Sequence, residues 1–411
     1  MTPPPTNLPV DKRDGVRFAL KLGRALHIYG ASATRLEAVM GVLSTELGLR
    51  GHFFSMPTAL LASFELPGEE GFAHLFRLRR NEVDFDKLCR LDRLWNDVVT
   101  GQVSPVQGLA DIDRIDEEKP LYGSILLTIC FALSSGAAST FFGGGPREMA
   151  LAALCGLLLG LFLLFAGPRK SLIGLHELLS ASLVSFTAVI AGHFMGGASV
   201  DTATLAGIII LLPGFTLTTA VSELAQRNVV SGAARLAWSS LLLMMLGFGV
   251  MAGRTLGERL VGLPEFHEVI SWPSWIQPAA LMVAGITLGI LFQAQKRDLP
   301  WITAAAMLPY LALEAGIAQL GLELGVFLAA LLAGAGSNLY ARVLDRPATI
   351  TRLPGILILV PGSIGFLSIT ELMKGDPLVG LEQGFQMLTT AFSLVSGLLV
   401  SNAVIPPRKA L

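Results

Sequence analysis

Two Pro-Gly pairs, each at the end of an aliphatic run, are the residues of this chain whose types and spacing most clearly suggest chemistry. Pro213-Gly214 follows the run Ile208–Leu212, and Pro361-Gly362 follows the run Ile356–Val360. Proline removes a backbone donor and glycine permits irregular dihedral angles, so each pair predicts a break in an apolar helix. A broken membrane helix offers free backbone groups to a small polar solute, and two breaks in matching places are typical of a transporter site.

The two pairs belong to an internal repeat. Glu223 matches Glu371 and Gly232 matches Gly380, and these pairs share the 148-residue offset of the two prolines. A chance resemblance between apolar runs is one alternative, but the common register of proline, glycine and glutamate argues against it. A duplication retained only for packing is the other alternative.

Hydroxyl side chains follow both breaks and could hydrogen-bond the solute. We therefore expect a substrate site built from eight residues: Pro213, Gly214, Thr216, Thr218, Thr219, Pro361, Gly362 and Ser363. The carbonyls of Ile209 and Ile210, freed by the first break, are expected to help. Serine and threonine also join membrane helices without any ligand, so for each hydroxyl taken singly a structural role is the alternative.

Three carboxylates in or near the apolar segments are candidates for proton coupling. Glu314 is expected to be the deepest of them, and burial raises the pKa of a carboxyl group toward neutrality. A static hydrogen bond to a neighbouring helix is the alternative for Glu314. Glu223 and Glu371 follow their prolines by ten residues, about 15 Å along a helix. Gating or interfacial placement is the alternative for both.

The composition indicates the elements that must hold these residues. Charged residues make up 15% of the 411 residues, against about 25% in soluble domains. A membrane span needs about 20 mostly apolar residues. Ten such runs are present, at 121–142, 147–167, 174–195, 202–224, 233–253, 275–295, 300–320, 323–341, 351–373 and 384–405. The chain is therefore expected to be a polytopic helical membrane protein.

Loop charges give the expected orientation. With the N-terminus in the cytosol, the short cytosolic loops carry 11 Lys and Arg residues and the opposite loops carry 4. The two breaks lie in the fourth and ninth runs, an offset of five spans, so the second copy runs in the opposite direction. We expect two inverted repeats of five spans, 120–254 and 275–405, joined by an extracytoplasmic loop, 255–274. Such repeats support alternating access.

The first 119 residues have a different character. Of 61 charged residues, 32 lie in the first 120 positions. Helical periodicity around Phe18–Tyr29, a capping box at Thr34–Glu37 and short apolar runs after Gly48 predict a cytosolic α+β domain over 15–119, preceded by a disordered segment, 1–14. A regulatory or assembly role is expected, with a hydrolase or metal site as the alternative. A 406–411 tail ends the chain in the cytosol.

Several classes of partner are not indicated. Cys89, Cys130 and Cys155 lack metal-ligand spacing, and no phosphate-loop or zinc-protease pattern occurs, so neither a metal nor a cofactor is expected. No basic stripe with aromatic residues suggests nucleic acid. No basic cluster followed by an apolar core marks a signal peptide. The lipid bilayer is the expected environment, and a homo-oligomer is compatible with the sequence.

The sequence resembles a known family. Gly30–Glu37, Leu47-Gly48, Pro57-Thr58 and Phe142–Gly144, together with the two Pro-Gly pairs, are similar to motifs of the bacterial threonine/serine exporters. The resemblance implies a polar domain before about ten spans in a bacterial inner membrane. It also implies proton-driven export of threonine and serine, and it identifies no catalytic residues.

Other functions remain open at this stage. Some members of the resembled family are split into two chains and are associated with export of a dicarboxylate. A membrane-tethered enzyme or sensor acting through the N-terminal domain is a second interpretation, and a passive channel is a third.

Overall fold

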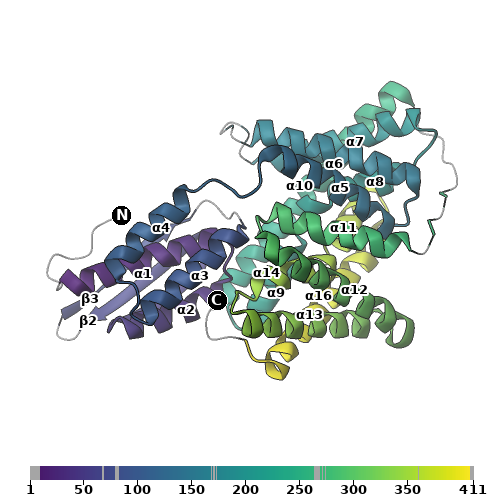
Figure 1. The fold of residues 1–411 in the computed structure, drawn as a ribbon. Helices are drawn as coiled ribbons and strands as arrows, with labels where there is room; N and C mark the ends of the chain where they lie inside the picture. Colours follow the sequence, from purple (N-terminus) through teal and green to yellow (C-terminus); the bar gives the residue numbers. More distant parts are fainter. Residues whose placement is uncertain are drawn as a thin grey trace.

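The computed structural model describes residues 10–66, 69–78, 83–167, 169, 172, 174–262, 269–270, 272–273, 275–359 and 361–407. Figure 1 shows a small α/β part beside a larger bundle of helices. We call the first part, residues 10–117, the N-terminal domain and the second, residues 124–404, the membrane domain. The chain is a polytopic helical membrane protein, as the sequence predicts.

The N-terminal domain is a three-stranded antiparallel sheet covered by helices, in the order α1 Val10–Ile28, α2 Ala33–Glu46, β1 Arg50–Met56, β2 Ala59–Leu66, β3 Glu69–Arg77, α3 Phe85–Val99 and α4 Pro105–Glu117. The strands form a meander, with β2 between β1 and β3. Leu60 on β2 pairs with Ser55 and Phe76. The core contains the fully buried Phe18, Leu22, Met40 and Phe64. Asp84 caps α3 by accepting from the Lys87 N–H.

Three element boundaries differ from the sequence expectation. α1 begins at Val10, so residues 10–14 are helical rather than disordered. α4 was not expected, and it begins with Ser104 as the cap and Pro105 in the first turn. The long helix before the inter-repeat loop extends to Val261, so that loop does not begin at 255.

The membrane domain consists of the elements α5 Ser124–Phe141, α6 Pro146–Ala166, α7 His176–Phe194, α8 Val200–Gly207, η2 Ile209–Leu211, α9 Gly214–Ala225, α10 Val229–Val261, α11 Ile276–Leu291, η3 Lys296–Asp298, α12 Leu299–Leu320, α13 Leu322–Leu344, α14 Thr349–Leu359, α15 Gly362–Lys374 and α16 Pro377–Val404. Within the described residues, 8 helices are long and apolar enough to cross a membrane, or 9 if the bent α8–α9 pair is one span. α11 corresponds to the sixth expected run, 275–295, but it has only 16 residues.

The helices pair in the same way in the two halves. In the first half α5 packs on α6, α6 on α8, α7 on α10, and α9 on α10. In the second half α11 packs on α12, α12 on α14, α13 on α16, and α15 on α16. Across the middle, α10 contacts α15 and α16 contacts α9, while α5 contacts α11. Every one of these pairings thus has its counterpart in the other half.

Close glycine contacts repeat this correspondence at the level of single residues. A β carbon placed on Gly232 would lie 2.9 Å from the carbonyl oxygen of Ala220. One placed on Gly380 would lie 3.0 Å from that of Ser368. Both pairs keep the 148-residue offset seen in the sequence. The repeated residues therefore make equivalent helix contacts.

Both Pro-Gly pairs interrupt helices. Pro213 has ψ 35° and precedes α9, and Pro361 has ψ 23° and precedes α15. The two breaks nevertheless differ in shape. α8 and α9 are bent by 47° around the one-turn η2, whereas Thr349–Lys374, which contains α14 and α15, continues as one span.

Candidate functional site

The two breaks meet at the centre of the membrane domain. A β carbon placed on Gly362 would lie 3.0 Å from the α carbon of Gly214 and 3.2 Å from its nitrogen. Only glycine permits this approach, because any side chain at this position would press on backbone. The N-termini of α9 and α15 therefore begin side by side.

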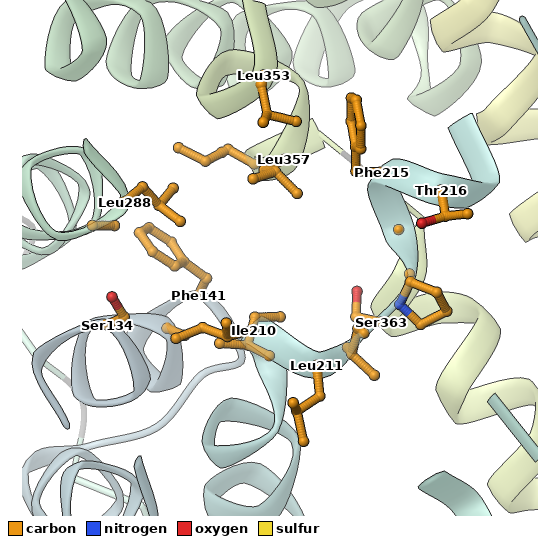
Figure 2. A pocket seen from close by; sticks show the side chains of 18 of the residues that line it. Ser134, Phe141, Ile210, Leu211, Phe215, Thr216, Leu288, Leu353, Leu357 and Ser363 are labelled. Carbon is orange, nitrogen blue, oxygen red and sulfur yellow. The ribbon is translucent and has the colours of Figure 1, made fainter. Parts of the chain in front are cut away.

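A cavity of about 430 Å³ lies against these breaks, within the range of roughly 300–1,000 Å³ typical of small-ligand sites. Figure 2 shows side chains from both halves arranged around it. Ile209–Thr216 form one wall together with Gly362 and Ser363, and α5, α11, α12 and α14 supply most of the others. The cavity is thus shared between the two repeats of the sequence.

Most of the lining is apolar, with a few polar groups among it. Ser134, Thr216, Tyr310 and Ser363 carry the hydroxyls. Ser134 donates to the Thr287 hydroxyl at 2.7 Å, which joins α5 to α11. In Figure 2 the Ser363 hydroxyl faces the open centre of the cavity, across from Phe141 and Leu288. None of the described residues that line the cavity is charged.

Five of the eight predicted substrate residues line this cavity, and three do not. The five are Pro213, Gly214, Thr216, Gly362 and Ser363. Pro361 lies outside the lining, although it adjoins Gly362. Thr218 is buried away from the cavity, and its hydroxyl has no hydrogen-bond partner among the described residues. The Thr219 hydroxyl donates to the Phe215 carbonyl of its own helix at 2.8 Å.

One backbone expectation is wrong. The Ile209 carbonyl accepts from the Leu212 N–H at 3.3 Å inside the η2 turn, so the break does not leave it without a partner. The one-turn helix forms because i→i+3 bonds can satisfy carbonyls that a break leaves over.

The three carboxylates occupy different environments. Glu314 is exposed on α12, so it is not buried among the helices of the membrane domain. It lies close enough to Tyr310, a residue of the cavity lining, for a side-chain hydrogen bond. Glu371 forms an ion pair with Lys374 at 2.8 Å.

Glu223 is the buried member of the set, at 2% exposure. The Arg235 Nε donates to both of its oxygens, at 3.2 and 3.1 Å. The Ser231 hydroxyl donates to the second oxygen at 2.7 Å. These contacts join the end of α9 to the start of α10 and give the buried carboxylate its counter-charge.

The N-terminal domain faces this buried pair. Burial lowers the pKa of His27, and the Arg235 charge acts in the same direction. Burial also raises the pKa of Glu37, and the Glu223 charge adds to that effect. His27 and Glu37 therefore lie within electrostatic range of the α9–α10 connection.

A hydrolase site is not assembled around His27. Its Nδ1 lies 3.4 Å from the Ser55 hydroxyl, but Glu37 accepts from the Ser55 backbone N–H rather than from the ring. Ser55 is 1% exposed, so a substrate has no access to its hydroxyl. Among the described residues, no group of three His, Cys, Asp or Glu side chains is placed to hold a metal ion.

The sequence reasoning missed several lining residues. Tyr310 follows Pro309, a proline inside α12, and Ser134 lies in a run of small residues on α5. Both are polar interruptions of apolar helices, and that signal could have identified them. Val83 of the N-terminal domain also lines the cavity. No local pattern could have placed it there.

Comparisons with known proteins agree with this architecture. Two family models match the chain, one for a threonine/serine exporter over residues 17–257 and one for the threonine/serine exporter ThrE over residues 277–404. No solved structure is significantly similar to the chain.

The curated relatives include fungal membrane proteins. The chain is 26% identical to pheromone-regulated membrane protein 10 of Kluyveromyces lactis, over 95% of this chain and 44% of that protein. It is also 26% identical to the protein of that name from Saccharomyces cerevisiae strain YJM789, over 95% of this chain and 54% of that protein. The chain thus spans about half the length of these relatives. Because the family models together cover nearly all of its described helices, this membrane protein belongs to the threonine/serine exporter family.

Proposed function

We propose that this chain exports threonine and serine by alternating access, driven by the proton gradient, with its N-terminal domain in the cytosol of a bacterial cell. The observation that carries the proposal is the cavity between two broken helices that meet at Gly214 and Gly362. The excess of basic residues in the loops on the N-terminal side supports the orientation.

The chemistry of the cavity suits an amino acid. α9 and α15 both begin at its wall, and helix N-termini carry partial positive charge and free N–H groups that favour a carboxylate. The hydroxyls of Thr216 and Ser363 can hydrogen-bond the ammonium or the side-chain hydroxyl of the solute. A dicarboxylate would bring a second negative charge, and the described lining offers no cationic side chain for it.

The unequal breaks support alternating access. The first copy is bent by 47°, and the second continues as one span, although their sequences and helix contacts correspond. Inverted repeats allow a transporter to change the side on which it is open when the two copies exchange conformations. We therefore expect the opposite state to have α14–α15 bent and α8–α9 straighter.

Hydroxyl substitutions test the site. Thr216→Val and Ser363→Ala each remove one hydrogen bond to the solute, worth about 0.5–1.5 kcal/mol, so the concentration for half-maximal export should rise about 2- to 12-fold. Thr219→Val is the matched control, because its hydroxyl bonds its own helix and does not line the cavity. Efflux of threonine from preloaded proteoliposomes is the measurement. Equal effects at positions 216 and 219 would contradict this site.

Glu314 tests the coupling. We expect Glu314→Gln to keep threonine exchange but to lose acceleration by an imposed pH gradient, because the amide cannot bind and release a proton beside Tyr310 at the cavity wall. Glu323→Gln is the control, since Glu323 lies in the first turn of the adjacent helix α13. A Glu314→Gln protein whose export still follows the gradient would exclude Glu314 as the carrier.

A further inference from the structure

The transport cavity is not built by the membrane domain alone. Val83, which lies between β3 and α3 of the N-terminal domain, is one of its lining residues. Val83 also packs with Phe215, Phe292 and Leu353 in an apolar cluster. The N-terminal domain therefore supplies part of the cavity wall through Val83.

α3 has two apolar faces with different partners. Leu88, Leu91 and Leu94 belong to the core of the N-terminal domain. Phe85 and Cys89, one helical turn apart, are buried instead against residues of the membrane domain. The Phe85 and Phe292 rings lie 5.3 Å apart. A helix that packs on both sides connects the two domains rigidly while they are docked.

The backbone of α3 also caps a membrane helix. The N–H of Phe85 donates to the Phe292 carbonyl at 2.9 Å, and the N–H of Asp86 donates to the Gln293 carbonyl at 3.2 Å. The first N–H groups of a helix and the last carbonyls of a helix have no partner within their own helices. Here the start of α3 and the end of α11 satisfy each other, and their dipoles are aligned favourably.

A polar cluster surrounds this junction. Asp298 accepts from Arg346 at 2.5 Å and from the Tyr340 hydroxyl at 3.0 Å. Gln295 connects the cluster to the N-terminal domain, since it accepts from Arg346 at 3.0 Å and donates to Asp86 at 2.5 Å. Burial raises the pKa of the Cys89 thiol beside them.

The distribution of these charges makes release possible. Asp298, Tyr340 and Arg346 all belong to the membrane domain, so they still pair with one another after α3 leaves. Undocking therefore leaves neither charge of the buried Asp298–Arg346 pair without its partner. Release breaks the packing of Val83, Phe85 and Cys89 and the two backbone hydrogen bonds. It also breaks the side-chain bonds from Gln295 to Asp86 and from Arg346 to Cys89. The docking surface between the two domains can therefore separate while the buried ion pair stays intact, as movement of the N-terminal domain requires.

We propose that the N-terminal domain is the cytoplasmic gate of the transport cavity, with Val83 covering the cavity and the start of α3 docking on the end of α11. The proposal rests on the transport function and the orientation proposed above. Substrate from the cytosol reaches Gly214 and Gly362 when α3 lifts from Phe292. The gate closes when Phe85 and Asp86 return to the α11 carbonyls.

A reversible cross-link tests the gate. Asp86→Cys and Gln295→Cys, in a protein with Cys89, Cys130 and Cys155 replaced by serine or alanine, are joined by a short thiol-cleavable reagent. We expect threonine export to fall at least 10-fold when the link forms and to return on reduction. The matched control joins Arg90→Cys to Glu118→Cys, a pair on the N-terminal side of the junction, where linking should change export by less than twofold.

Two outcomes separate failure of the gate from failure of the function. Fully linked protein that exports at the rate of the reduced protein overturns the gate. Reduced, correctly inserted protein that moves neither threonine nor serine overturns the transport proposal instead.

The gate retains a test of its own that needs no transport. In a protein whose only cysteine is Cys89, labelling by N-ethylmaleimide should be at least 10-fold faster in Phe85→Ala than in the parent, because loss of the ring weakens docking. Leu61→Ala, on the exposed side of β2, is the control. Equal Cys89 labelling in all three proteins would overturn the docking on which the gate depends.

Discussion

Replacing Gly362 by valine is expected to abolish export. A β carbon at this position would lie 3.0 Å from the Gly214 α carbon, and the neighbour is backbone that cannot rotate away. Gly362→Ala should retain partial activity, since one methyl group forces a shift that costs about 1–3 kcal/mol, whereas a branched side chain forces the breaks apart. The measurement is the initial rate of threonine efflux from proteoliposomes, divided by the amount of monodisperse protein of each variant.

Gly336→Ala provides the comparison for this series. Gly336 is an exposed residue of α13, and a β carbon added to it would meet none of the described atoms within 4 Å. Alanine in a helix interior is favoured over glycine by roughly 0.5–1 kcal/mol, so this variant should be fully active and no less stable. If Gly362→Val transports at the parental rate, the contact between the two breaks has no part in the mechanism.

Arg235→Met should give the largest loss of stability. It removes the cation beside Glu223, which is 2% exposed, and leaves the neutral Ser231 hydroxyl of α10 to donate to that carboxylate. Removing one partner of a buried ion pair typically costs about 3–5 kcal/mol because the other charge remains uncompensated. We expect a clear drop in the midpoint of thermal unfolding in detergent, measured by the temperature at which monodisperse protein is lost.

The double variant identifies the cause. Glu223→Gln with Arg235→Met removes the stranded charge, so most of the lost thermal stability should return. The exposed pair Arg254 and Asp201 is the control, because ion pairs of that kind contribute only about 0–1 kcal/mol. A double variant as unstable as Arg235→Met alone would show that the guanidinium acts by packing rather than by its charge.

The central site was predictable because its signal is local and repeated. Proline and glycine at the ends of aliphatic runs interrupt helices wherever they occur, so Pro213 and Pro361 could be assigned breaks without any tertiary information. Their equal spacing from Glu223 and Glu371 then indicated a duplication. The contact between Gly214 and Gly362 could be seen only in the assembled structure, because it joins two different helices.

The orientation of individual side chains was not predictable in the same way. Thr216, Thr218 and Thr219 lie on one short helix, and only its rotation decides which of them faces the cavity. Glu314 lies in an apolar run, yet α12 turns it to the outer surface. These choices depend on how neighbouring helices pack, which the sequence of one helix does not specify.

The contribution of the N-terminal domain was the least accessible. Val83 stands between a strand and a helix with no periodic pattern around it, and its partners Phe215, Phe292 and Leu353 are more than 130 positions away in the chain. Phe85 and Cys89 have the sequence character of ordinary core residues of α3. Only the assembled structure shows that their partners belong to the other domain.

The attachment of the N-terminal domain has a consequence for regulation. The domain continues through a short linker into α5 of the first half, yet its residues Phe85 and Asp86 bond residues 292 and 293 at the end of α11, in the second half. Tyr122 of the linker bonds the next carbonyl, that of Ala294. The domain thus bridges both halves and must respond to their relative displacement. In the proposed exporter, by thermodynamic linkage, any ligand that prefers one position of the domain changes substrate affinity, and substrate changes the affinity for that ligand by the same factor. With the orientation proposed above, the bridge would couple the concentration of solute inside the cell to a protein surface outside the membrane domain.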